Sequence, residues 1–288
     1  DILRYEELLR VAAAACRLGV RKIRVTGGEP LVRRGLVPFI RSLAQLPEKP
    51  EIVLTTNGIL LARHAADLKA AGLRRVNVSL DTLREDRFRA MTRNESGLGE
   101  VLAGLKAAEE AGLHPIKLNV IPLRGFNEDE IIDFALLTRN HDWEVRFIEF
   151  MPISADLDYV LEDGVPFAQI DRMLQSLGDL EERPRPATAG PARLYRLPGA
   201  LGQIGLIPSV SGHFCGECNR LRVTADGRIR GCLFDNREID LKPVLRSEEA
   251  DATLEDLLRN AACAKPEKHA IGSGGFQRPN RRMHGIGG

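Results

Sequence analysis

The chain has 288 residues, of which 43% are hydrophobic and 28% charged, and its formal net charge is +1. A chain of this length buries a core without disulfides, and the composition is that of an ordinary soluble globular protein. The near-neutral charge and the shortness of the apolar runs exclude a general affinity for nucleic acid and a membrane span. We therefore expect a cytoplasmic protein with neither kind of partner.

Short β-branched runs alternate with amphipathic helical runs through the first half, after a helix expected over residues 5–18. The predicted strands cover residues 22–25, 51–55, 75–80, 116–121 and 144–150. The predicted helices between them cover residues 36–46, 60–71, 98–111 and 128–139. This alternation is typical of βα units around a parallel sheet.

The pattern changes after residue 151, which divides the chain into an expected first part, 1–151, and a second part, 152–288. Residues 183–198 are rich in Pro, Arg and Ala and predict a surface linker. A strand is expected over residues 201–207 and a helix near residues 254–263. Two further runs, 221–225 and 228–234, flank Asp226-Gly227, which is a strong hairpin signal.

Three of the five cysteines are clustered in the second part. Cys215-Gly-Glu-Cys218 places two thiols at a spacing that suits a metal or a metal cluster. If Asp226 and Gly227 form a two-residue turn, Leu221 faces Cys232 and brings this third thiol within reach of the pair. The sequence therefore predicts a metal site on Cys215, Cys218 and Cys232.

Two kinds of metal remain open at this stage. Three protein ligands leave a position for a substrate, as an iron–sulfur cluster would, whereas His213 as a fourth ligand would close a zinc site. Of the other cysteines, Cys16 lies on the apolar face of the first helix and Cys263 has no partner at ligand spacing. We expect both to be structural.

Basic residues lie next to the cysteines and within the predicted strands. Arg220 and Arg222 are two apart and so point to one face of a strand, and guanidinium groups suit phosphate oxygens. Arg24, Lys117 and Arg146 lie in strands that a parallel barrel would arrange around one axis. The alternative is that the hairpin arginines only form a solvated face.

A glycine-rich turn, Thr26-Gly27-Gly28-Glu29-Pro30, ends the first predicted strand. The glycines let a ligand approach the backbone, and a carboxylate with exposed carbonyls would suit an ammonium group. The turn matches neither GxGxxG nor GxxxxGK[ST], so it is no phosphate loop. The strand ends at residues 55–58 and 79–81 are also small and polar, as at the mouth of a barrel active site.

Taken together, these motifs resemble a known family. The turn at residues 26–30 resembles the S-adenosylmethionine-binding turn of radical SAM enzymes. With residues 77–81, residues 146–151, the Cys215-x2-Cys218-x13-Cys232 set and the Gly287-Gly288 tail, the chain resembles the radical SAM cyclases that act on GTP in molybdenum cofactor biosynthesis.

The resemblance implies an α/β fold: an incomplete (β/α)6 TIM-like barrel, here without its first strand, and a C-terminal α+β region with an auxiliary iron–sulfur cluster. The implied reaction is the radical cyclisation of GTP to (8S)-3′,8-cyclo-7,8-dihydroguanosine 5′-triphosphate, the first step of molybdopterin biosynthesis. The implied partners are GTP, an electron donor and the enzyme that converts the product to cyclic pyranopterin, with a homodimer as a further option.

The resemblance also assigns roles to residues of this chain. The auxiliary [4Fe–4S] cluster would be held by Cys215, Cys218 and Cys232, and S-adenosylmethionine by Gly28, Ser79 and Met151. GTP would be bound by Arg24, Thr55, Lys117, Arg220, Leu221 and Arg222. Arg146, Gly287 and Gly288 would support catalysis.

One departure from the family is that these 288 residues contain no CxxxCxxC, the motif for the cluster that cleaves S-adenosylmethionine. We expect that motif and its [4Fe–4S] cluster ahead of Asp1, and these 288 residues alone to be inactive. Two alternatives remain: another radical SAM enzyme with an auxiliary cluster, or a non-catalytic zinc module that binds a nucleotide or a partner.

Overall fold

A curved sheet of eight strands forms the body of the protein. The computed structural model describes residues 2–92, 97–153, 159–184, 190–212, 214–247, 251–269, 271 and 276–286. Within these residues the strands follow the order β1-β2-β3-β4-β5-β8-β7-β6. The pairs from β1 to β5 and the pair of β5 with β8 are parallel, whereas β7 is antiparallel to both β8 and β6. The α/β class is confirmed, and the described sheet is open, with β1 at one edge and β6 at the other.

The first half of the chain alternates strands and helices. Its strands are β1 Lys22–Val25, β2 Glu51–Thr56, β3 Arg75–Ser79, β4 Ile116–Val120 and β5 Trp143–Ile148. Its helices are α1 Tyr5–Arg17, α2 Leu36–Ala44, α3 Leu61–Ala70, α4 Glu85–Thr92, α5 Leu98–Glu110 and α6 Ile131–Asn140. The strand and helix predictions for this half are confirmed, except that α4 was not expected.

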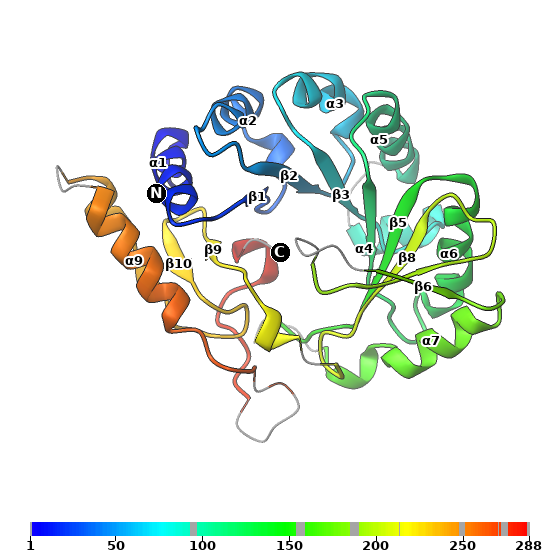
Figure 1. Cartoon of the computed structure of the whole chain (residues 1–288). Coiled ribbons are helices and arrows are strands. Elements are labelled where there is room, and N and C mark those ends of the chain that lie inside the picture. The colour runs from blue at the N-terminus through cyan, green and yellow to red at the C-terminus, as the bar shows by residue number, and fades with distance from the viewer. Residues whose placement is uncertain are drawn as a thin grey trace.

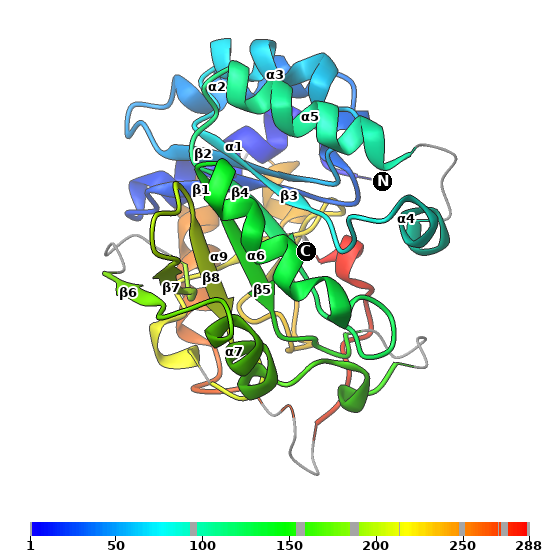
Figure 2. The same ribbon diagram turned by 90° about the vertical axis from the view of Figure 1, so that its right-hand side faces the viewer.

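The two faces of the sheet carry different residues because side chains alternate along a strand. Outward positions are apolar, as in Val76 and Val78 of β3, and they pack in the main core against the helices. Figures 1 and 2 show these helices along the outer face of the sheet, with α5, α6 and α7 outside strands β4, β5 and β8. The inward positions of the same strands are polar, which is unusual for buried parallel strands and marks the interior as a site.

A close approach of α5 to the turn after β2 depends on one glycine. A Cβ at Gly104 would lie 2.5 Å from the carbonyl oxygen of Gly58, so any side chain there would push α5 away. Gly58 itself has a φ of 84°, a conformation that glycine adopts at little cost. The two glycines therefore fix how α5 and α3 cover the polar end of β2.

The second half adds strands to the same sheet. Its elements are α7 Phe167–Gln175, β6 Glu181–Arg183, β7 Arg193–Arg196, β8 Gln203–Ile207, β9 Arg222–Val223, β10 Arg228–Arg230, β11 Ile239–Asp240, α8 Lys242–Leu245 and α9 Asp251–Cys263. Strand β8 pairs with β5, and β7 pairs antiparallel with β8. The prediction of a linker over residues 183–198 is therefore wrong for β7, and the sheet continues across residue 151.

The hairpin of β9 and β10 lies with α9 beside α1, as Figure 1 shows. Leu3, Val11, Ile229 and Leu258 share a second apolar cluster, which joins this C-terminal layer to the start of the chain. The backbone N–H of Leu3 also donates to the carbonyl of Ala225 at 2.7 Å. The C-terminal layer is thus fixed next to the open edge of the sheet at β1.

The predicted hairpin register is wrong by one residue. Arg222 pairs with Arg230 and Val223 with Ile229, so the loop contains three residues between Thr224 and Arg228. Gly227 has a φ of 82°, and Thr224 accepts from its N–H, which is the usual form of a three-residue loop. A shift of one residue exchanges the two faces of a strand, so Leu221 does not face Cys232 as predicted.

No helix within the described ranges combines the length and the apolar character that a membrane crossing requires.

Candidate functional site

The inner face of the sheet lines a cavity of about 340 Å³. Four of its lining residues, Lys22, Glu51, Arg75 and Gln203, are the first residues of their strands, so the cavity lies at the N-terminal ends of the strands. One layer of residues runs in register across five strands and includes Gln203 of this rim: Thr55, Asn77, Lys117, Glu144 and Gln203. The polar residues that the sequence placed in separate strands thus meet around one interior.

Four cations of this interior are paired by two carboxylates. Glu51 lies 3.0 Å from both Lys22 Nζ and Arg75 Nε. Glu144 lies 2.5 Å from both Lys117 Nζ and Arg146 Nε, and all three of these side chains are about nine-tenths buried. Each carboxylate therefore holds two cations at fixed positions on the cavity wall.

Three further arginines form no ion pair with a carboxylate among the described residues. Arg24, Arg220 and Arg222, here called the arginine trio, are close enough to repel one another. Loss of water around the guanidinium, and then repulsion from Arg220, lower the pKa of Arg24 to about 9, although its side chain still reaches solvent through the open interior. The same two causes lower the pKa of Arg222 to about 10. All three remain cationic at neutral pH, and an anion would relieve their repulsion.

Contacts within the C-terminal half place one member of the trio at the cavity. A Cβ added to Gly190, a cavity-lining residue, would lie 3.8 Å from Arg220 Nη2. The guanidinium of Arg220 also lies 5.7 Å from the ring centroid of Phe214, just before Cys215. Arg220 therefore connects the cysteine segment to the cavity wall.

Lys117 is the most strongly perturbed amine of the cavity. Burial, and then repulsion from Arg146, lower its pKa to about 8, although the carboxylate of Glu144 acts in the opposite direction. Its charge therefore depends on Glu144 and on any anion that binds nearby.

At the opposite end of the strands lie the residues predicted to bind S-adenosylmethionine. Gly28 follows β1, Ser79 ends β3 and Met151 follows β5. A Cβ at Gly28 would meet no heavy atom within 4 Å, so this backbone is open to a ligand. The three residues thus lie toward the C-terminal edge of the sheet.

The carboxylate of Glu29, which the sequence suggested for an ammonium group, already accepts three hydrogen bonds within the protein. It accepts from Thr56 Oγ1 at 2.8 Å, from the backbone N–H of Leu31 at 3.0 Å and from that of Asn57 at 2.7 Å. Glu29 therefore ties the glycine turn to the end of β2, and an ammonium ligand is left with the carbonyl groups of the turn. Another carboxyl group, that of Asp81, follows β3; burial raises its pKa to about 6 although it accepts from the N–H of Ile121.

The three predicted metal ligands are free thiols. Cys215 starts the short 3-10 turn Cys215–Glu217, Cys218 donates its N–H to the carbonyl of Cys215 at 3.0 Å, and Cys232 follows β10. All three are partly exposed, whereas Cys16 is buried, as predicted, and Cys263 is exposed. Burial opposes ionisation of Cys218, but the N–H of Arg220 and the ammonium of Lys265 outweigh it and lower the pKa of this thiol.

The fit of these cysteines to a cluster rests on their chemistry. They are reduced, and Arg222 lies within electrostatic range of both Cys218 and Cys232, so cations offset the charge of the thiolates. Within the described ranges, no three His, Cys, Asp or Glu side chains are already gathered as ligands of one ion. Each thiolate of a cubane cluster binds a different iron, which requires a wider spacing than a single ion does. His213, the predicted alternative ligand, lies outside the described residues.

The remaining predicted residues have mixed outcomes. Thr55 Oγ1 accepts from Asn77 Nδ2 at 3.3 Å on the inner face of the sheet, and Leu221 packs its side chain against the C-terminal apolar cluster. Gly287 and Gly288 lie outside the described residues. The preceding Ile286 is fully buried, and this end of the chain lies inside the curve of the sheet in Figure 1.

Sequence reasoning missed Lys22, Glu51, Arg75, Glu144 and Lys265. A polar residue at every second position of a buried strand is the signal that could have found Arg75 and Glu144.

Comparisons with known proteins show which families the chain matches. Residues 1–138 match the family model described as the radical SAM superfamily, and residues 143–271 match the model described as molybdenum cofactor synthesis C. A GTP 3′,8-cyclase of Pelotomaculum thermopropionicum is 48% identical over 100% of this chain and 88% of its own length. GTP 3′,8-cyclases of Heliobacterium modesticaldum and Geobacter sulfurreducens are 46% and 45% identical over 100% of this chain and 88% and 87% of theirs.

Proposed function

We infer the reaction of this protein from its family: the chain belongs to the GTP 3′,8-cyclase family within the radical SAM superfamily. The protein is a radical SAM enzyme of molybdenum cofactor biosynthesis. It cyclises GTP to (8S)-3′,8-cyclo-7,8-dihydroguanosine 5′-triphosphate.

The observation that carries this proposal is the arginine trio beside the cavity. Three guanidinium groups that pair with no carboxylate in the part of the chain that the structure describes, beside a wall that holds four compensated cations, suit an anion with several charges. A triphosphate is such an anion, and guanidinium forks bind phosphate oxygens in pairs. The carboxylate of Glu144 already holds Lys117 and Arg146 in place before the substrate arrives, which lowers the ordering cost of binding.

In this proposal the two ligands are bound by residues at opposite ends of the strands. Arg24, Arg220, Arg222 and Lys117 bind the triphosphate at the N-terminal ends of the strands, and Thr55 and Leu221 contribute further substrate contacts. Gly28, Ser79 and Met151 hold S-adenosylmethionine at the C-terminal ends. Two ligands held at opposite ends of the barrel point their reactive groups at each other, which is the positional part of catalysis.

Membership of the radical SAM superfamily implies an iron–sulfur cluster and S-adenosylmethionine. Cys215, Cys218 and Cys232 would hold the auxiliary [4Fe–4S] cluster, with one iron left for the guanine base. When bound, the clusters and S-adenosylmethionine supply the one-electron chemistry that removes a hydrogen atom from the ribose. In this proposal Arg146, Gly287 and Gly288 support catalysis.

Further elements of the proposal concern the setting of the enzyme. The two parts of the chain, residues 1–151 and 152–288, bind mainly S-adenosylmethionine and the auxiliary cluster, respectively. An electron donor is required, the product passes to the enzyme that forms cyclic pyranopterin, and the protein acts in the cytoplasm, with a homodimer as one assembly state.

The test is an anaerobic assay of the natural gene product that carries these 288 residues, reconstituted with iron and sulfide. With GTP, S-adenosylmethionine and a reductant, we expect 5′-deoxyadenosine and an isomer of GTP in equal amounts, detected by mass spectrometry. The variant Arg228→Ala should retain this activity. Arg228 lies on the same hairpin as Arg222 of the arginine trio but already pairs with Asp240 at 3.2 Å. Formation of 5′-deoxyadenosine with a peptide substrate, and none with GTP, would favour the other radical SAM function.

A further inference from the structure

One lysine contacts the cysteine pair from a distant part of the sequence. Lys265 follows α9, and its Nζ donates to the carbonyl oxygen of Cys218 and, at 3.2 Å, to that of Arg220. The same Nζ lies 3.5 Å from Cys218 Sγ, within hydrogen-bond distance for sulfur. The ammonium group therefore has three acceptors, and all belong to the segment that carries the CxxC motif and the first arginine of the hairpin.

The stem of Lys265 also contacts the segment that carries the third cysteine. A Cβ at Gly231, the residue before Cys232, would lie 3.0 Å from Lys265 Cγ and 2.8 Å from the carbonyl oxygen of Ala261. A side chain at this position would therefore displace the lysine or the end of α9. Lys265 thus contacts both segments that carry the predicted metal ligands.

The chain around Lys265 is fixed by contacts of its own. Arg237 Nη2 donates to the carbonyl of Ala264 at 3.1 Å, and the same arginine is paired with Asp235 Oδ2 at 2.6 Å. These bonds fix the corner after α9 to the segment that follows Cys232. The backbone next to Lys265 is therefore bonded to the segment that follows Cys232.

We propose that Lys265 is a positioning residue of the cysteine site: it donates a hydrogen bond to the sulfur of Cys218 and places a positive charge beside the auxiliary cluster. This inference rests on the proposed function, because that function puts a cluster on Cys215, Cys218 and Cys232. Hydrogen bonds and positive charge at cluster sulfurs stabilise the reduced state, which carries one more electron, and so raise the reduction potential. By binding the carbonyl of Arg220 as well, Lys265 sets the distance between the cluster and the arginine trio.

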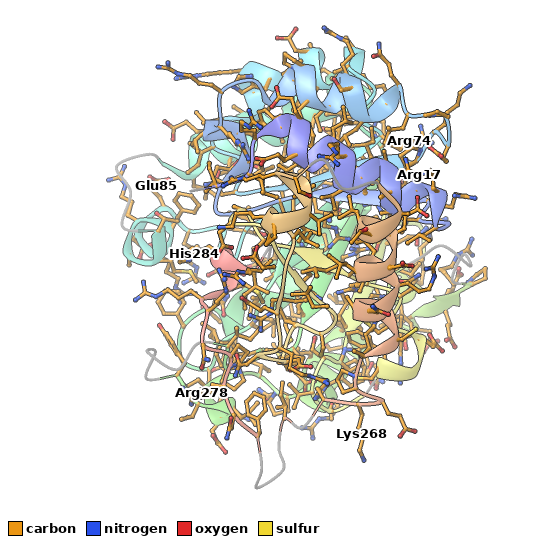
Figure 3. All side chains as sticks on the ribbon, turned by 90° about the vertical axis from the view of Figure 1, so that its left-hand side faces the viewer. Arg17, Arg74, Glu85, Lys268, Arg278 and His284 are labelled. Carbon is orange, nitrogen blue, oxygen red and sulfur yellow. The ribbon has the colours of Figure 1, made fainter. Side chains whose placement is uncertain are left out.

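The experiment compares the 288-residue chain with Lys265→Gln, Lys265→Arg and Lys268→Gln, all reconstituted anaerobically. Lys268 is a matched control, because it is an exposed lysine of the same segment whose side chain points away from the protein in Figure 3. The measurements are iron per chain and the midpoint potential of the cluster from a redox titration followed by electron paramagnetic resonance. We expect a more negative midpoint in Lys265→Gln, and midpoints near that of the unsubstituted chain in Lys265→Arg and Lys268→Gln.

The iron content and the midpoint potential together decide whether Lys265 has this role. A midpoint in Lys265→Gln equal to that of the unsubstituted chain, at equal iron content, overturns the inference. If Lys265→Gln binds less iron while Lys265→Arg and Lys268→Gln load fully, the charge is what holds the cysteine segments, and the inference stands. Iron loss in both Lys265 variants overturns the charge role, whereas an unsubstituted chain without iron refutes the proposed cluster itself.

Discussion

The substitution Arg222→Ala tests the binding role of the arginine trio. Arg222 lies on β9, within electrostatic range of Arg220, Cys218 and Cys232, and no carboxylate among the described residues pairs with it. If it contacts a phosphate of GTP, its removal deletes a charge-assisted hydrogen bond worth about 1.5–3 kcal/mol. That loss corresponds to roughly a 10- to 150-fold weaker affinity for GTP.

The assay is isothermal titration of the reconstituted protein with GTP, GDP, GMP and guanosine under anaerobic conditions. The loss in Arg222→Ala is expected to be full for GTP and absent for guanosine, because guanosine has no phosphate to contact. Arg228→Ala is the control, since Arg228 lies on the partner strand β10 and already pairs with Asp240. An unchanged GTP affinity in Arg222→Ala, or an equal loss for guanosine, would refute the assignment of the trio to the triphosphate.

Three further predictions concern the cavity and the cysteines. Because the pKa of Lys117 is about 8 without substrate, its charge is present below that pH and lost above it. GTP affinity should therefore fall by about tenfold between pH 7 and pH 9. A titration of Lys117→Arg should lack this fall, and a fall of the same size in that variant would contradict the role of Lys117. Glu144→Gln should lower the free energy of unfolding by about 3 kcal/mol, since it leaves Lys117 and Arg146 without their carboxylate. In urea titrations, inorganic triphosphate should stabilise this variant more than it stabilises the unsubstituted protein. Equal stabilisation of the two would speak against a shared anion site. Cys232→Ser should lose cluster iron and visible absorbance while Cys263→Ser keeps both, and full iron in Cys232→Ser would count against the ligand set.

The sequence predicted the strands of the first half because a buried parallel strand leaves a strong signal. Alternating apolar positions such as Val76 and Val78 must face the helices, and a Gly or a polar residue marks where each strand ends. The signal is weaker where burial is slight. Helix α4 buries only Phe88 and was missed, and β7 lies in a segment whose Pro and Arg content is typical of a linker.

The hairpin shows why a turn signal does not fix a register. Asp226-Gly227 correctly marked the turn, but the same dipeptide serves a two-residue or a three-residue loop. The choice was made by Thr224, whose Oγ1 bonds to Asp226 Oδ1 at 2.6 Å and accepts from the N–H of Arg228 at 2.9 Å. These bonds depend on side-chain orientation, which spacing alone does not give.

The site was predicted only in part, for a similar reason. Cations at inward positions could be read from the alternation, as Arg24, Lys117 and Arg146 were. Which of them a carboxylate compensates depends on the strand register that places Lys117 beside Glu144. Lys265 is 47 residues from Cys218, and only the packing of α9 against the hairpin brings them together.

The origin of the hydrogen atom is the most direct test of the central claim, that this chain cyclises GTP at its ribose. The measurement is turnover of the natural gene product with GTP that carries deuterium at the 3′ carbon, followed by mass spectrometry of both products. We expect one deuterium atom in each molecule of 5′-deoxyadenosine and none at the ribose carbon of the cyclised nucleotide. Deuterium that stays on the ribose while 5′-deoxyadenosine forms would contradict it.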